Sequence, residues 1–203
     1  MAHYELSTPV DETAIRKLRV NDTVSLQRTL FGIRDATQIA MFDRGRKTHF
    51  DLSGHAVIHT APNVRKVEPC AQYPAGYAPV CIGTTTSARM ERFTRPLMSQ
   101  YGVRMVVGKG GLLADSLAAF RELGGVYLAI VGGTAALETT WIDAIEDVDL
   151  DDLNPESLWK FRIRDFGPLL VAMDSHGASL YEGVRKTVRD SAERVLAELG
   201  VGS

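Results

Sequence analysis

The most hydrophobic segment of the chain is Val126-Tyr127-Leu128-Ala129-Ile130-Val131, which lies between two pairs of glycines. A short apolar run of this kind predicts a strand that is buried on both faces, as in a sheet covered by other layers. Helical and extended patterns alternate along the rest of the chain, so we expect an α/β layered domain. A length of 203 residues suits one domain over residues 1–203.

Residue patterns place the other elements of this domain. We expect further strands over residues 22–30, 55–60, 103–107, 159–164 and 169–174. We expect helices over residues 8–18, 35–42, 87–101, 112–123, 135–137 and 178–199, the last with Val184, Val188, Ala192, Val195 and Leu199 on one side. Thr8 and Asp35 are the predicted N-caps, and Gly124 is the predicted end of helix 112–123. Residues 61–79 are expected to form a long loop, and the acidic residues 142–153 a solvated edge.

Composition argues against several classes of function. The formal net charge is −2 and the pI is near 6.2, so no strong field attracts nucleic acid or an anionic membrane. No apolar run is long enough to span a bilayer and the first residues lack the pattern of a signal peptide, so we expect a cytoplasmic protein. The only cysteines are Cys70 and Cys81, and the histidines show no metal-ligand spacing. We therefore expect this chain alone to hold neither a metal ion nor an iron–sulfur cluster.

Two polar segments are suited to binding an anion. The first is Gly83-Thr84-Thr85-Thr86-Ser87-Ala88-Arg89-Met90, and the second is Val107-Gly108-Lys109-Gly110-Gly111. An arginine can grip a carboxylate with two hydrogen bonds, a lysine adds a point charge, and hydroxyls donate hydrogen bonds or transfer protons. The alternative interpretation is a threonine that caps a helix, a solvated arginine and an ordinary glycine turn.

The remaining motifs give weaker evidence of function. The Gly108-Lys109 segment lacks the hydroxyl residue of a phosphate-binding P-loop, and no dinucleotide-binding glycine pattern follows a strand. Asp174-Ser175-His176 are consecutive, which rarely supplies a catalytic triad. His59, at the end of an expected strand, is either a base or carboxylate donor or a satisfied core histidine.

Three cations share one kind of position in the expected fold. Arg34, Arg89 and Lys109 all stand at strand ends or helix starts, with Thr85 and Thr86 close in sequence to Arg89. In open α/β sheets these junctions meet at the edge where ligands bind. Three cations at one site suit a dicarboxylate better than an anion with a single charge.

The chain resembles the β subunit of class I iron–sulfur hydro-lyases, of the fumarase and L(+)-tartrate dehydratase type, and hence the C-terminal domain of single-chain class I fumarases. The resemblance covers nearly the whole chain, because its motifs occur in the same order. They are Leu18 to Asp22, Arg34-Asp35-Ala36, Asp51 to Gly54, His59 to Pro62, Gly83 to Met90, Val107 to Gly111, Pro155 to Trp159, Phe166 to Leu169 and Asp174 to Gly177.

The resemblance implies a swivelling β/β/α fold and the reversible dehydration of a 2-hydroxy dicarboxylate. It implies that a [4Fe-4S] cluster is carried by a partner α subunit, in a hetero-oligomer or homodimer. By motif, Arg34, Arg89 and Lys109 would bind substrate carboxylates with His59 nearby, and Thr85 would transfer a proton with Thr86 alongside. Three features depart from the family pattern: Gln38 replaces a histidine, Thr84 replaces a proline, and the segment 61–79 is long.

Three hypotheses follow. The first is the β subunit of a heteromeric hydro-lyase that is inactive without its α subunit. The second is a non-catalytic dicarboxylate-binding or assembly module with the same fold. The third is an unrelated α/β enzyme that uses His59 or His176 and would keep its activity after Arg89→Ala and Lys109→Ala.

Overall fold

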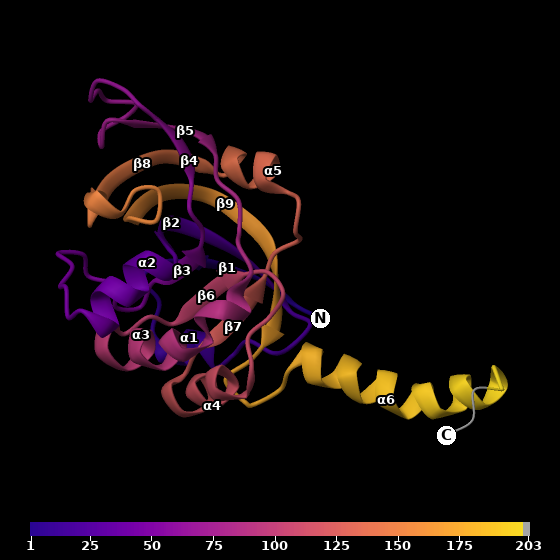
Figure 1. The fold of residues 1–203 in the computed structure, drawn as a ribbon. Coiled ribbons are helices and arrows are strands. Elements are labelled where there is room, and N and C mark those ends of the chain that lie inside the picture. The colour runs from indigo at the N-terminus through magenta and orange to yellow at the C-terminus, as the bar shows by residue number, and fades with distance from the viewer. Residues whose placement is uncertain (201–203) are drawn as a thin grey trace.

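The computed structural model describes residues 1–200 and shows a mixed α/β fold, as predicted (Figure 1). A seven-stranded sheet has the order β1-β2-β3-β6-β7-β9-β8. Its strands are β1 (His3–Ser7), β2 (Thr23–Ile33), β3 (Ala56–His59), β6 (Met105–Gly108), β7 (Val126–Ala129), β8 (Ile142–Asp149) and β9 (Leu158–Met173). β4 (Asn63–Lys66) and β5 (Tyr77–Cys81) form a separate hairpin at the top of Figure 1.

The main sheet closes on itself through its last strand. Parallel pairs join β1 to β2, β2 to β3, β3 to β6 and β6 to β7. β9 runs antiparallel to β7 and also to β2, so that β2, β3, β6, β7 and β9 form a ring. β8 pairs with β9 alone and lies at the edge of the sheet, as predicted for the acidic segment, but it is a strand with Ile142, Ala144 and Ile145 buried rather than a fully solvated segment. The carboxyl ends of β2, β3 and β6 therefore meet at one edge.

Nine helical segments accompany the strands in the described part of the chain. They are α1 (Glu12–Ile15), α2 (Asp35–Gln38), the π-helical η1 (Ile39–Asp43), the 3₁₀ helix η2 (Ser87–Phe93), α3 (Thr94–Tyr101), α4 (Ala114–Leu123), α5 (Ala135–Thr140), the 3₁₀ helix η3 (Asp151–Leu153) and α6 (Leu180–Glu198). Residues of α3 and α4 pack with Tyr127 in one apolar cluster, whereas Val126 and Leu128 belong to a second cluster. β7 is therefore buried on both faces, as its apolar sequence predicted.

Glycine ends α4 in the predicted way. Gly124 adopts a left-handed conformation with φ of 69°, and its backbone N–H donates to the carbonyl of Phe120. A residue with a side chain would be strained there, because the left-handed region favours glycine.

Several local predictions were wrong. Asp11, not Thr8, caps the first helix by accepting from the Ala14 N–H at 2.7 Å, while the Thr8 hydroxyl donates to the Thr29 carbonyl at 2.6 Å. The expected loop over residues 61–79 contains the β4–β5 hairpin, whose strands are too short to give a periodic signal. Gly167-Pro168 does not split two strands, because pairing with β2 on either side of it keeps β9 continuous.

The last helix projects away from the rest of the protein (Figure 1). The apolar residues predicted on one side of α6 are largely solvent-exposed: Val184 is 62%, Val188 60%, Val195 43% and Leu199 70% exposed. In the first turn of α6, the Tyr181 ring lies 6.3 Å from the Tyr127 ring between centroids. The helix is therefore anchored at its start. Within residues 1–200, no helix combines the length and apolar character needed to cross a membrane.

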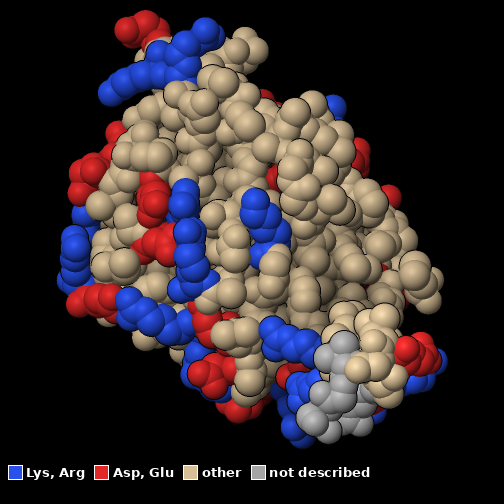
Figure 2. Space-filling model, turned by 45° about the vertical axis from the view of Figure 1, so that its right-hand side comes forward, with Lys and Arg blue, Asp and Glu red and all other residues tan. Residues whose placement is uncertain are grey.

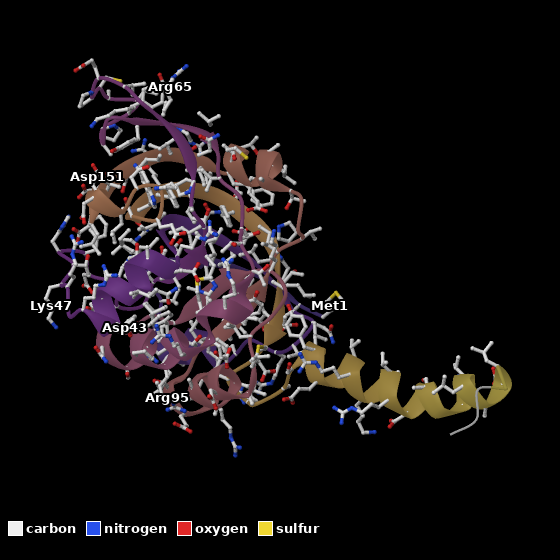
Figure 3. All side chains as sticks on the ribbon, viewed as in Figure 1. Met1, Asp43, Lys47, Arg65, Arg95 and Asp151 are labelled. Carbon is white, nitrogen blue, oxygen red and sulfur yellow. The ribbon has the colours of Figure 1, made fainter. Side chains whose placement is uncertain are left out.

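Charged side chains lie mostly at the periphery. Figure 3 shows Asp43, Lys47, Arg65 and Arg95 at the outside of the molecule, with Arg65 on the β4–β5 hairpin. On the face shown in Figure 2, basic and acidic side chains are interspersed. This distribution agrees with the near-neutral net charge of the sequence.

Candidate functional site

The six residues singled out by sequence meet at the edge of the sheet where β2, β3 and β6 end. Arg34 follows the last residue of β2, His59 is the last residue of β3, and Lys109 follows the last residue of β6. The segment that carries the threonines crosses these ends. The Thr85 N–H donates to the His59 carbonyl at 2.8 Å, and Thr86 pairs with Lys109 in an isolated β-bridge.

One carboxylate connects the two arginines. The Asp35 Oδ2 atom lies 3.3 Å from Arg34 Nε and 3.2 Å from Arg89 Nη2. The same Nη2 atom of Arg89 donates to Thr85 Oγ1 at 3.2 Å. A guanidinium therefore contacts the threonine hydroxyl directly, and a nearby positive charge favours the deprotonated form of such a group. Sequence reasoning treated Asp35 only as a helix cap, so its role as the shared ion-pair partner was missed.

The start of α2 depends on a residue far along the chain. Arg34 occupies the N-cap position in an extended conformation, so the prediction that Asp35 is the cap was wrong. The carboxylate that accepts from the new helix belongs to Glu156, whose Oε2 accepts from the Ala36 N–H at 2.7 Å. Glu156 Oε1 also lies 3.4 Å from Arg34 Nε. Glu156 thus holds both the helix start and the arginine. Its position within the Pro155 to Trp159 motif was the signal available in the sequence.

Lys109 contributes a charge that is not paired in the part of the chain described. Among the side chains that the structure describes, which leave out residues 193 and 201–203, no carboxylate oxygen lies within 4.0 Å of its Nζ. Its backbone carbonyl accepts from the Ser87 N–H at 3.0 Å. Gly110 and Gly111 follow with φ of 78° and 79°, a conformation that residues with side chains rarely adopt. The loop therefore fixes the backbone of Lys109 beside the threonine segment.

A buried glutamate holds the start of the threonine segment. Glu138 Oε2 accepts from the Thr84 N–H at 3.1 Å, and Oε1 accepts from the Thr134 hydroxyl at 2.8 Å. Burial raises the pKa of Glu138, whereas these hydrogen bonds and the charge of Lys109 act in the opposite direction. A proline at position 84 would have no N–H to donate. The threonine at this position therefore supplies a backbone hydrogen bond that a proline could not make.

His59 is a core histidine in this structure. Its side chain is 1% exposed, and burial lowers its pKa to about 4, so the imidazole is uncharged at neutral pH. The charge of Asp35 raises this pKa and that of Arg89 lowers it, both by less than burial does. The His59 Nδ1 atom lies 3.0 Å from Ser87 Oγ, and the Tyr127 hydroxyl donates to the same oxygen at 3.0 Å. Ser87 and Tyr127 were not singled out from the sequence.

The alternative interpretation of the threonine segment fails in two respects. Thr86 precedes η2, but its exposed side chain makes no capping hydrogen bond. Arg89 is half-exposed, yet it is bound to Asp35 and Thr85 rather than free in solvent. The segment is therefore a structured part of the sheet edge.

The other candidate motifs have structural roles. Asp174 Oδ1 accepts from the backbone N–H groups of His176 and Ala178 at 2.9 and 3.0 Å, which stabilises the turn before α6. His176 Nε2 lies 2.9 Å from the Arg16 carbonyl. No triad is formed by Asp174, Ser175 and His176. Among the described residues, no group of three or more histidine, cysteine, aspartate or glutamate side chains is arranged to hold a metal ion.

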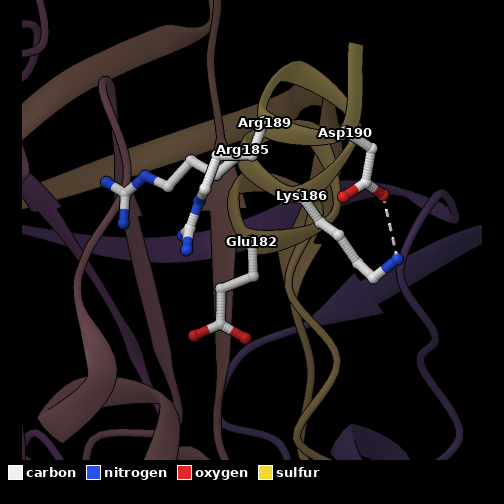
Figure 4. Close-up of a pocket in the computed structure, with 5 residues that line it drawn as sticks. All are labelled: Glu182, Arg185, Lys186, Arg189 and Asp190. Atoms are coloured by element: carbon white, nitrogen blue, oxygen red, sulfur yellow. Dashed lines mark hydrogen bonds and ion pairs between the residues drawn. The ribbon is translucent and has the colours of Figure 1, made fainter. Parts of the chain in front are cut away.

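A separate hollow lies on α6 and is not part of this site. Figure 4 shows its five lining residues, all from that one exposed helix: Glu182, Arg185, Lys186, Arg189 and Asp190. Lys186 Nζ pairs with Asp190 Oδ2 at 3.1 Å, one helical turn away. This is the solvated polar side of the helix, where such pairs contribute little to stability.

The chain matches a family model described as the fumarase C-terminus, over residues 1–184. The chain belongs to this family. It is 33% identical over 195 residues to an L(+)-tartrate dehydratase subunit beta of Escherichia coli K12, covering 96% of this chain and 94% of the relative. It is 36% identical over 187 residues to a putative L(+)-tartrate dehydratase subunit beta of Methanocaldococcus jannaschii, with 90% and 93% coverage.

A third relative is a longer protein. It is a putative fumarate hydratase class I of Geobacillus stearothermophilus, 37% identical over 183 residues, covering 90% of this chain and 34% of the relative. The resemblance to the β subunit, or C-terminal domain, of these hydro-lyases is therefore confirmed. The match also means that most of α6 lies beyond the segment shared by the family model.

Proposed function

We propose that this chain is the β subunit of a [4Fe-4S]-dependent hydro-lyase that reversibly dehydrates a 2-hydroxy dicarboxylate of the malate or tartrate type. The observation that carries the proposal is that Arg34 and Arg89 share the Asp35 carboxylate beside Thr85, with the backbone of Lys109 at the same sheet edge. The names of the relatives supply the reaction class. The fold is proposed to be of the swivelling β/β/α type, and the compartment the cytoplasm.

The cluster does not fit the residues of this chain. Cys70 is exposed, Cys81 is partly buried, and both lie in or beside the β4–β5 hairpin rather than at the sheet edge. A cluster of this kind is held by three or four thiolates. We therefore assign the cluster to a partner α subunit, as the subunit naming of the relatives suggests, within a hetero-oligomer or a homodimer of such pairs.

The residues of this chain have separable tasks in the proposed reaction. Asp35 pairs with both guanidiniums, so that a substrate carboxylate meets donors that are already oriented. Lys109 has no carboxylate partner among the described side chains. Its flexible ammonium group is therefore available to pair with the second carboxylate of the substrate. Thr85 Oγ1 is the proposed site of proton transfer, because the Arg89 guanidinium donates a hydrogen bond to it at 3.2 Å; Thr86 lies beside it in the sequence.

The test is co-expression with an α chain that carries the cluster cysteines, followed by anaerobic reconstitution. The complex is expected to hydrate fumarate or dehydrate tartrate, while this chain alone shows no turnover. A cluster-loaded complex that acts on no C4 or C5 dicarboxylate would refute the proposal. Thermal stabilisation of the isolated chain by succinate, together with that failure, would instead favour the dicarboxylate-binding module.

A further inference from the structure

A buried chain of hydrogen bonds runs behind the candidate site. It joins Tyr127 on β7, Ser87 at the start of η2 and His59 at the end of β3, and all three side chains are at most 1% exposed. The Tyr127 hydroxyl and the His59 Nδ1 atom both contact Ser87 Oγ at 3.0 Å. This series of hydrogen bonds therefore connects β7, in the interior of the sheet, to His59, whose backbone carbonyl accepts from the Thr85 N–H.

The hydrogen-bond donors among these three side chains can be assigned by counting protons. Burial raises the pKa of Tyr127, so its hydroxyl keeps its proton. That hydroxyl donates its proton to Ser87 Oγ at 3.0 Å. A serine hydroxyl has one proton of its own. Since Ser87 accepts from Tyr127, that proton is available for the unprotonated nitrogen of His59.

We propose that Ser87 and Tyr127 are positioning residues that hold the His59 imidazole in the tautomer with its proton on Nε2. The charged groups that act on this imidazole are Asp35 and Arg89, which belong to the candidate site. In that tautomer His59 offers an uncharged N–H donor to an anionic ligand, with no desolvated positive charge to maintain. The identity of the ligand as a dicarboxylate rests on the proposed function; the tautomer does not.

The decisive measurement is NMR of the full chain labelled with ¹⁵N-histidine, which distinguishes the two ring tautomers by their nitrogen shifts. The His59 signals are assigned by their loss in His59→Asn. At pH 7 the wild-type His59 is expected to show the Nε2–H pattern. In Ser87→Ala the minor Nδ1–H tautomer is expected to increase about fivefold, because one net hydrogen bond has been lost. Tyr127→Phe is expected to shift the ratio in the same direction.

The control variant is Ser116→Ala, which removes another buried hydroxyl, one that donates to Thr94 Oγ1 at 2.8 Å. It should leave the His59 signals unchanged. An Nδ1–H pattern in the wild type would overturn the proposal. So would an unchanged tautomer ratio in a folded Ser87→Ala protein.

A second experiment uses the reconstituted complex and tests whether the Nε2–H of His59 contributes to substrate binding. Ser87→Ala is expected to raise the KM for the dicarboxylate about fivefold while kcat changes less than twofold. A KM that stays at the wild-type value would refute the link to the ligand. Failure of every complex to turn over would count against the proposed function, whereas the NMR result would still decide the tautomer.

Discussion

The burial of His59 predicts a specific pH dependence of folding stability. Burial lowers the pKa of His59 to about 4 from an ordinary value of 6.5. Between these two values the unfolded chain binds a proton that the folded protein does not bind, so the free energy of unfolding falls as the pH falls. The stabilisation is complete above pH 6.5 and is lost as the pH decreases toward 4. From pH 7 to pH 5 this one group accounts for about 2 kcal/mol.

The assay is urea unfolding of the isolated chain at pH 7 and pH 5, followed by the fluorescence of Trp141 and Trp159. Other groups also titrate in this range, so wild type is compared with His59→Asn, which has no titratable imidazole. Asparagine places an acceptor oxygen near the position of Nδ1 and can still accept from Ser87. The wild type is expected to lose about 2 kcal/mol more than the variant on acidification. Equal losses in the two proteins would show that His59 is not buried and uncharged.

Three further predictions concern stability and use urea unfolding at pH 7. Val188→Lys should change the free energy of unfolding by less than about 0.5 kcal/mol, because Val188 is 60% exposed; a loss above about 1.5 kcal/mol would mean that α6 packs on the body. Gly111→Ala should cost about 3 kcal/mol, because its Cβ would lie 2.7 Å from the Tyr181 ring at φ of 79°. Gly133→Ala, at φ of 86° with no atom within 4 Å, should cost only about 1 kcal/mol, and equal costs would contradict the steric argument. Glu138→Ala should cost about 2 kcal/mol, because it removes the acceptor of a buried backbone N–H; a neutral effect would contradict that contact.

The sequence was most informative where the determinant is local. The apolar run of β7, the glycine after α4 and the alternation of helix and strand each depend on residues close together in the chain, and the structure confirms them. Strand ends can be brought to one edge by reasoning about parallel sheets, which is why Arg34, Arg89 and Lys109 were expected to be neighbours.

The missed features depend on contacts between distant residues. Asp35 binds Arg89, which is 54 positions away, and Tyr127 donates to Ser87 across 40 positions. No local pattern identifies such partners. β9 was divided in the prediction because Gly167 next to a proline is a turn signal, whereas pairing with β2 on both sides of it keeps the strand continuous.

The central claim is that the cations of this chain bind the substrate of a shared site. Its most direct test is kcat/KM of the reconstituted, cluster-loaded complex carrying Arg89→Gln, with Arg46→Gln as the control. Arg46 pairs with Asp152 at 2.7 Å on the surface and should leave kcat/KM unchanged. Arg89→Gln is expected to lower kcat/KM about 100-fold or more, because a charge-assisted bond to a carboxylate is lost. A value within threefold of wild type, with the cluster intact, would contradict the claim.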